Sequence, residues 1–260
     1  MKKAITVFWF TLLCVCISRG GLYSVTTLNS AITQDFDTLA SSGTSSTVPT
    51  GWGFSESGTG ANLTYAAGTG SGNAGNTYSF GAAGSTERAF GGLQSGSLIP
   101  TIGFGMQNNS GSTITSFIIA YTGEQWRLGA TGRPDRLDFQ YSTDANSLTT
   151  GTWHDADAFD FLAPVTGGTV GALDGNATAN RTDISGTLSG ITFVVGNQMW
   201  IRWSSFDATG FDDGLAIDNF SITAVPEPVN VALAIFGGIG ATVLGVRRFV
   251  IRRNQTQTPV

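Results

Sequence analysis

The stretch from residue 24 to residue 224 contains no segment in which apolar residues recur with a sustained period of 3.6. An amphipathic helix needs that period, whereas short apolar runs bounded by Gly, Asn and Ser are typical of strands. Roughly ten such runs follow one another, with a turn about every eight to fifteen residues. The pattern predicts an all-β fold, an antiparallel β-sandwich with jelly-roll-like connectivity over residues 30–224.

Two neighbouring runs, 101–106 and 114–121, flank the polar segment 108–111. A short polar turn between two apolar runs predicts a β-hairpin. The second run is apolar on both faces when it is read with the two-residue period of a strand. We therefore expect it to be a central strand whose second face is covered by a loop.

The net charge of −5 conceals a strongly acidic central stretch. Of the 13 basic residues, three lie before residue 24 and four after residue 246, whereas Glu227 is the only one of the 18 acidic residues outside residues 24–224. Six basic and seventeen acidic residues remain, a formal charge of −11 without any Lys. Such a stretch repels phosphates, so nucleic acid is excluded as a partner, and cation binding is favoured.

Residues 229–246 form an apolar run that is followed by a basic cluster, Arg247, Arg248, Arg252 and Arg253. A bilayer core of about 30 Å requires roughly 20 apolar helical residues, with about 17 as a lower limit. The run is therefore predicted to be one transmembrane helix, with its basic flank on the cytoplasmic side. The preceding residues are then expected beyond the inner membrane.

The tripeptide Pro226-Glu227-Pro228 stands directly before this helix. Tripeptide, helix and arginines, together residues 225–253, resemble the PEP-CTERM sorting signal of Gram-negative bacteria that make exopolysaccharide. The resemblance implies that an exosortase-type transpeptidase of the inner membrane recognises Pro226, Glu227 and Pro228, and that the helix is a temporary anchor. The implied destination is the cell surface or the extracellular space, and residues 254–260 form a polar tail.

The N-terminus has the pattern of a secretory signal. Lys2 and Lys3 precede an apolar segment, residues 4–17, that is too short to span a bilayer and is followed by small residues. Residues 1–23 are thus predicted to be a helical signal peptide, cleaved between residues 18 and 24; an uncleaved anchor is the alternative. Both cysteines lie in this segment, so the exported domain, residues 24–224, is expected to hold no disulfide.

Acidic residues are densest between Phe206 and Phe220. Asp218 has the strand parity of Phe220, which is expected to face the core, so either a β-bulge lies near Asp218 or both faces of the strand are covered. A carboxylate beside a buried layer needs hydrogen-bond donors or a cation, and hard oxygen ligands suit Ca²⁺. Turn capping by the aspartates is the alternative. The candidate calcium ligands are Asp207, Asp212, Asp213, Asp218 and, if the terminal strands pair, Asp37.

The sequence offers little for catalysis. His154 is the only histidine, and no Gly-x-Ser-x-Gly motif is present. Glu56, Glu87 and Glu124 could supply the two carboxylates of a glycosidase, but they lack a closely spaced acidic signature, and Glu124 is expected to form a salt bridge with Arg127. The chain is therefore predicted not to be an enzyme.

Three tryptophans lie near expected strand ends or loops, where aromatic rings can form a platform for sugars. They are Trp52, Trp126 and Trp153. The alternative for each is partial burial as a lid on the core, and Trp200 and Trp203 are expected inside the core.

Residues 123–127, 180–182 and 212–220 also resemble a group of secreted bacterial modules, found in PEP-CTERM proteins and beside extracellular nucleases. No activity accompanies this second resemblance. The expected function is that of a non-catalytic, exported component of the cell surface or the extracellular matrix. One alternative is a carbohydrate-binding module for exopolysaccharide, and another is a glycan-active hydrolase.

Overall fold

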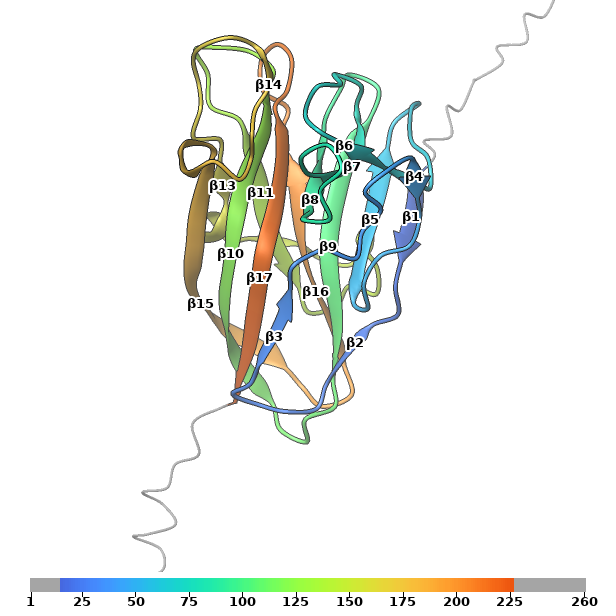
Figure 1. Cartoon of the computed structure of the whole chain (residues 1–260). Coiled ribbons are helices and arrows are strands. Elements are labelled where there is room, and N and C mark those ends of the chain that lie inside the picture. Colours follow the sequence, from blue (N-terminus) through green and yellow to red (C-terminus); the bar gives the residue numbers. More distant parts are fainter. Residues whose placement is uncertain (1–14, 227–260) are drawn as a thin grey trace, which may run out of the picture. The chain divides into compact units, whose positions relative to one another are not determined.

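Two β-sheets make up the residues that the computed structural model describes, 15–226 (Figure 1). Within this range the only helical pieces are short 3-10 turns, η1 (Asp157–Phe159) and η2 (Thr178–Asn180). The all-β prediction is confirmed. No helix among residues 15–226 is long and apolar enough to cross a membrane. Residues 1–14 and 227–260, which include Glu227, Pro228, the predicted helix 229–246 and the arginine cluster, lie outside the described residues.

The first sheet has eight strands and is built around β9 and β16. Its order is β1 (Val15–Arg19), β5 (Trp52–Ser57), β9 (Ile99–Asn108), β16 (Gln198–Ser205), β11 (Arg136–Ser142) and β12 (His154–Asp155), with β2 (Tyr23–Val25) on β9 and β13 (Phe161–Leu162) on β11.

The second sheet has nine strands and is built around two long neighbours, β10 and β17 (Figure 1). Its order is β14 (Gly171–Ala172), β10 (Ile114–Leu128), β17 (Gly214–Pro226), β8 (Ala89–Leu93), β7 (Asn76–Phe80), β6 (Tyr65–Gly68) and β4 (Thr44–Ser45), with β15 (Arg181–Phe193) on β10 and β3 (Ala31–Gln34) on β17.

Two strand pairs are parallel, β2 with β9 and β6 with β7. The sheets are therefore mixed. This corrects the prediction of a purely antiparallel sandwich. In each parallel pair one partner has only three or four residues, β2 and β6, so these pairs extend the sheets beside longer antiparallel strands.

The expected hairpin of residues 101–106 and 114–121 is wrong. β9 belongs to the first sheet and β10 to the second, and the segment between them carries the chain from one sheet to the other. β10 is a central strand, as predicted, because β15 and β17 pair with it on its two sides. Its second face is only partly covered, since Ile118 on that face is 50% exposed.

The main core lies between the sheets and is rich in aromatic rings. Trp52 of the first sheet stacks on Trp203 with ring centroids 5.9 Å apart and meets Phe220 of the second sheet edge-on at 5.0 Å. Phe90 and Phe104 join the same cluster. Edge-to-face aromatic pairs contribute about 0.5–1.5 kcal/mol each beyond the burial of their area, so these rings hold the two sheets together as a sandwich.

β17 contains a β-bulge beside Asp218, which is one of the two arrangements that the parity of Asp218 predicts. Ala120 pairs with Ser221 and Thr122 with Asp218, so two steps along β10 match three steps along β17. The extra residue is Asn219, whose φ is +50°. The bulge lies directly beside Asp218 and sets the direction of that side chain.

β1 lies in the segment predicted to be a signal peptide. Its residues, Val15–Arg19, pair antiparallel with β5 at the edge of the first sheet. Cleavage between residues 18 and 24 would remove most or all of β1 and leave β5 as an edge strand.

Candidate metal centre

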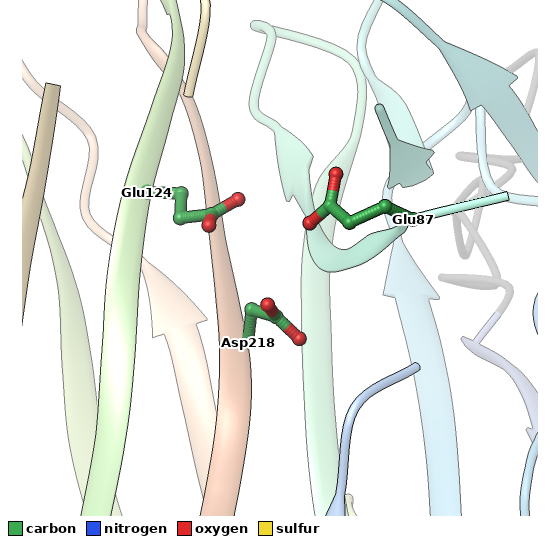
Figure 2. A group of neighbouring side chains, drawn as sticks. All are labelled: Glu87, Glu124 and Asp218. Carbon is green, nitrogen blue, oxygen red and sulfur yellow. The ribbon is translucent and has the colours of Figure 1, made fainter. Parts of the chain in front are cut away.

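Three carboxylates from three separate segments of the second sheet converge (Figure 2). Glu87 lies in the segment that leads into β8, Glu124 in β10 and Asp218 in β17. One oxygen atom of each lies within 4.8 Å of the others. The side chains extend toward the space between β10, β17 and the Glu87 segment, as Figure 2 shows.

The pairing of β10 with β17 places two of these side chains on one face. Thr122 pairs with Asp218, and Glu124 follows two residues after Thr122, so the period of a strand directs Glu124 to the same face. Trp126 continues this face and packs in a small cluster with Phe80, separate from the main core. The candidate centre therefore lies on the side of the second sheet that faces away from the sandwich interior.

Each carboxylate has one oxygen that accepts a hydrogen bond. The donors are Trp126 Nε1 to Glu124 Oε2 at 2.9 Å, Asn219 Nδ2 to Asp218 Oδ2 at 2.8 Å, and Asn176 Nδ2 to Glu87 Oε2. The other oxygens, Glu87 Oε1, Glu124 Oε1 and Asp218 Oδ1, are buried and have no hydrogen-bond partner among residues 15–226. Buried polar atoms without a partner are rare in proteins, and three such carboxylate oxygens side by side are the arrangement that a bound cation would satisfy.

Burial and mutual repulsion shift the titration of these groups. Burial, with the charge of Asp218 adding to it, raises the pKa of Glu124 to about 8. Burial, with the charges of Glu87 and Asp37 adding to it, raises the pKa of Asp218 to about 7. A bound cation would act in the opposite direction, because it attracts the ionised carboxylates.

The oxygen set fits a calcium ion. Ca²⁺ takes oxygen ligands at about 2.3–2.6 Å, so two oxygens on one ion are at most about 4.6–5.2 Å apart. The three oxygens lie within 4.8 Å of one another, close enough for one ion to contact all three. Only carboxylate oxygens form the group, with neither His nor Cys, and such hard ligands favour Ca²⁺ over softer metals.

Of the five aspartates predicted as calcium ligands, Asp218 alone belongs to this group. Asp37 lies just after β3, which pairs with β17 as the calcium hypothesis required. It is exposed, its Oδ1 accepts a hydrogen bond from Arg88 N at 3.1 Å, and its charge raises the pKa of Asp218. Asp37 is therefore a neighbour of the centre.

The other three predicted ligands lie elsewhere, so the composition of the predicted site was wrong. Asp207 is exposed, and Asp212 Oδ1 accepts a hydrogen bond from Ala208 N at 3.0 Å, which is the turn-capping alternative. Asp213 accepts hydrogen bonds from Gln125 Nε2 and Gly129 N at 2.7 Å each. Along a strand, the five residues from Asp213 to Asp218 span about 16 Å, which is too far for one ion.

Sequence reasoning placed Glu87 and Glu124 in another role, as carboxylates of a hydrolase. It also paired Glu124 with Arg127, whereas Arg127 Nη1 donates to Gly70 O and Ser71 O. Strand parity was the signal that could have corrected this, because residues three apart on a strand point to opposite faces. Nothing local in the sequence indicates that Glu87 reaches Glu124.

The predicted tryptophan platform is wrong for two of its three members. Trp52 and Trp126 are each 1% exposed. Trp52 lies inside the aromatic core, and the indole of Trp126 donates a hydrogen bond to Glu124. Trp153 is half-buried, and the guanidinium of Arg202 lies 3.8 Å from its ring centroid. Large aromatic rings bury much apolar area, which outweighed their position near strand ends.

The three motifs of the second resemblance meet around the centre. Residues 123–127 supply Glu124 and Trp126, and residues 212–220 supply Asp218 and its bulge. In residues 180–182, Arg181 of β15 lies opposite Glu124 of β10 in the strand register. The positive charge of Arg181 lowers the pKa of Glu124.

No protein-family model and no curated protein sequence matches this chain. Among solved structures, it is similar to TmCBM61 in complex with beta-1,4-galactotriose, with 10% identity, a TM-score of 0.31, and coverage of 55% of this chain and 74% of that one. It is also similar to the CBM22-1 xylan-binding domain of Paenibacillus barcinonensis Xyn10C, with 11% identity, a TM-score of 0.35, and coverage of 81% and 99%.

A further similar structure is the enzymatically active domain of tailspike protein 4 from bacteriophage CBA120. It shares 10% identity with this chain at a TM-score of 0.34, over 67% of this chain but only 19% of the tailspike chain. At such identities these similarities say nothing about ligand or activity.

Proposed function

We propose that this chain is an exported, non-catalytic, jelly-roll-like sandwich of the cell surface or extracellular matrix, and that it binds one calcium ion. Glu87, Glu124 and Asp218 are the proposed protein ligands. The observation that carries the calcium site is the set of three adjacent carboxylates, each with one buried oxygen that lacks a partner within residues 15–226. One divalent ion would satisfy all three oxygens and offset their repulsion.

Another buried glutamate shows how unusual this arrangement is. Glu56 and Glu124 are both 0% exposed. Glu56 accepts four hydrogen bonds at 2.8–3.0 Å, two from Thr77 and two from Asn62. Glu124 accepts one, from Trp126. The fold satisfies one buried carboxylate with its own donors and leaves the other for a cation.

Calcium binding is tested by thermal unfolding of the full chain in mild detergent, with added Ca²⁺ or with EGTA. We expect Ca²⁺ to raise the melting temperature of the wild type and to have no effect on Glu124→Gln. Glu56→Gln is the matched control: it places an amide against donors and should lower stability while retaining the calcium response. An unchanged wild-type melting temperature in Ca²⁺ would refute the site.

The geometry argues against one candidate catalytic residue, Glu124, and so supports the non-catalytic part of the proposal at that position only. A general acid or nucleophile must touch its substrate, and Glu124 is completely buried. Hydrolysis of a glycan by the wild type that is lost in Glu124→Gln would contradict this part of the proposal.

Export and sorting rest on the resemblance of residues 225–253 to the PEP-CTERM signal. Mass spectrometry of the protein recovered from cells should find a new N-terminus between residues 18 and 24 and a C-terminus close to Pro226-Glu227-Pro228. Recovery of the intact chain from the cytoplasm would overturn the proposal of export and sorting.

A further inference from the structure

A cavity with a mixed apolar and polar lining, distinct from the carboxylate centre, lies where several loops meet at the end of the strands. It has a volume of about 240 Å³ and is lined by Asn73 of the β6–β7 loop, Gln94 and Ser95 after β8, Arg127 of β10, and Phe211 and Asp212 of the β16–β17 loop. Sites for drug-sized ligands have roughly 300–1,000 Å³. The cavity is therefore suited to one small ring.

Hydrogen-bonding groups of both kinds line this cavity. Gln94 is 5% exposed, and its Oε1 has no hydrogen-bond partner in the part of the chain that the structure describes. Arg127 is fixed at the wall because its Nη1 donates to two carbonyl oxygens of the β6–β7 loop, 3.0 and 3.2 Å away. Asp212 adds acceptors, and Asn73 adds a donor and an acceptor.

Phe211 supplies the apolar face of the cavity. It is 73% exposed, although the fold buries most of its other aromatic rings. A residue with this exposure contributes little to the core, so its large ring is available for contact with a ligand.

We propose that this cavity binds one ring of a neutral saccharide. The C–H face of a sugar would lie on Phe211, and its hydroxyl groups, which donate and accept, would bond to Gln94, Arg127 and Asp212. Arg127 and Asp212 carry opposite charges, so the cavity offers no net charge to attract a sugar acid. The site shares no residue with the proposed calcium centre and stands independently of it.

Affinity gel electrophoresis of the full chain in mild detergent and Ca²⁺ tests the proposal. The gels contain dextran, laminarin, galactomannan or hydroxyethylcellulose, and a parallel gel contains the acidic polymer alginate. We expect at least one neutral polymer to slow the wild type, and Phe211→Ala to lose at least nine-tenths of that retardation. Phe211→Tyr, which keeps the ring, should retain it.

Phe206→Ala is the matched control, because Phe206 is also partly exposed and aromatic but packs on Arg136, with the guanidinium 4.1 Å from its ring centroid. It should bind like the wild type. Equal retardation of Phe211→Ala and wild type, retardation by alginate alone, or no retardation by any polymer would each overturn the proposal. Phe211→Ala should keep the calcium-dependent rise in melting temperature, so failure here is distinguishable from failure of the calcium site.

Discussion

Trp126 illustrates how one residue acts through another at the candidate centre. Its indole donates to Glu124 Oε2, and this hydrogen bond lowers the pKa of Glu124 against the effect of burial. Donors of this kind orient a metal ligand and favour its ionised form, and their loss typically weakens metal binding about 10–100-fold. Trp126 is therefore a positioning residue for the proposed ion.

We expect Trp126→Phe to weaken calcium affinity about tenfold, since Phe fills most of the indole volume but cannot donate. Trp200→Phe is the matched control, because Trp200 is equally buried and its Nε1 has no partner among residues 15–226. Isothermal titration with Ca²⁺ measures both. Equal affinities for the two variants would remove Trp126 from the site.

At the scale of the strand, the bulge in β17 decides where Asp218 points. Asn219 has a φ of +50°, a conformation that costs most residues roughly 1–2 kcal/mol and β-branched residues more. Asn tolerates it, and its Nδ2 also holds Asp218 Oδ2. Asn219 thus adopts the positive φ of the bulge and also donates a hydrogen bond to the carboxylate of Asp218.

Substitution of Asn219 separates these two roles. Asn219→Gly keeps the backbone conformation and should weaken calcium binding through the lost amide alone. Asn219→Val should also lower the free energy of unfolding by about 1–3 kcal/mol, because a β-branched residue resists positive φ. Urea unfolding in EGTA compares the variants. If Val and Gly unfold at the same urea concentration, the bulge does not depend on positive φ.

Strand parity carried much of what the sequence could predict about the elements. It predicted either a bulge near Asp218 or a strand covered on both faces, of which the structure has the bulge, and it indicated that β10 is central. The hairpin prediction failed because a polar turn between apolar runs looks the same whether the chain returns to its own sheet or crosses to the other. The ligand set failed for a related reason: Glu87 and Glu124 meet only through the pairing of β8 and β10 with β17, and local sequence does not encode such long-range order.

For the whole molecule, the shifted carboxyl groups link stability to pH. In the folded, calcium-free protein the pKa of Glu124 is about 8 and that of Asp218 about 7, against roughly 4 in the unfolded chain. Between pH 4 and pH 8 the folded state therefore binds more protons than the unfolded state. The free energy of unfolding of the calcium-free protein then falls as the pH rises from about 4 to 8. Burial also raises the pKa of Asp212 and Asp213 to about 6, in the same direction.

Calcium would compete with protons at its ligands Glu124 and Asp218, but not at Asp212 and Asp213, which lie outside the proposed centre. We therefore expect the difference in melting temperature between Ca²⁺ and EGTA to be small at pH 5 and to reach its maximum near pH 8, with each kcal/mol worth about 2–4 °C in a domain of this size. A series of melting curves measures it. A difference that is independent of pH would show that the ion binds elsewhere.

If the chain is exported as proposed, the convergence of Glu87, Glu124 and Asp218 would make calcium binding depend on where the protein is. Extracellular modules typically bind calcium with a Kd of about 10⁻⁴–10⁻³ M, concentrations that the cytosol does not supply. If the chain is exported into a calcium-rich medium as proposed, the ion would join Glu87 to Asp218, which are more than a hundred residues apart in sequence. The final folding step of such a protein would then occur only in the compartment that supplies calcium.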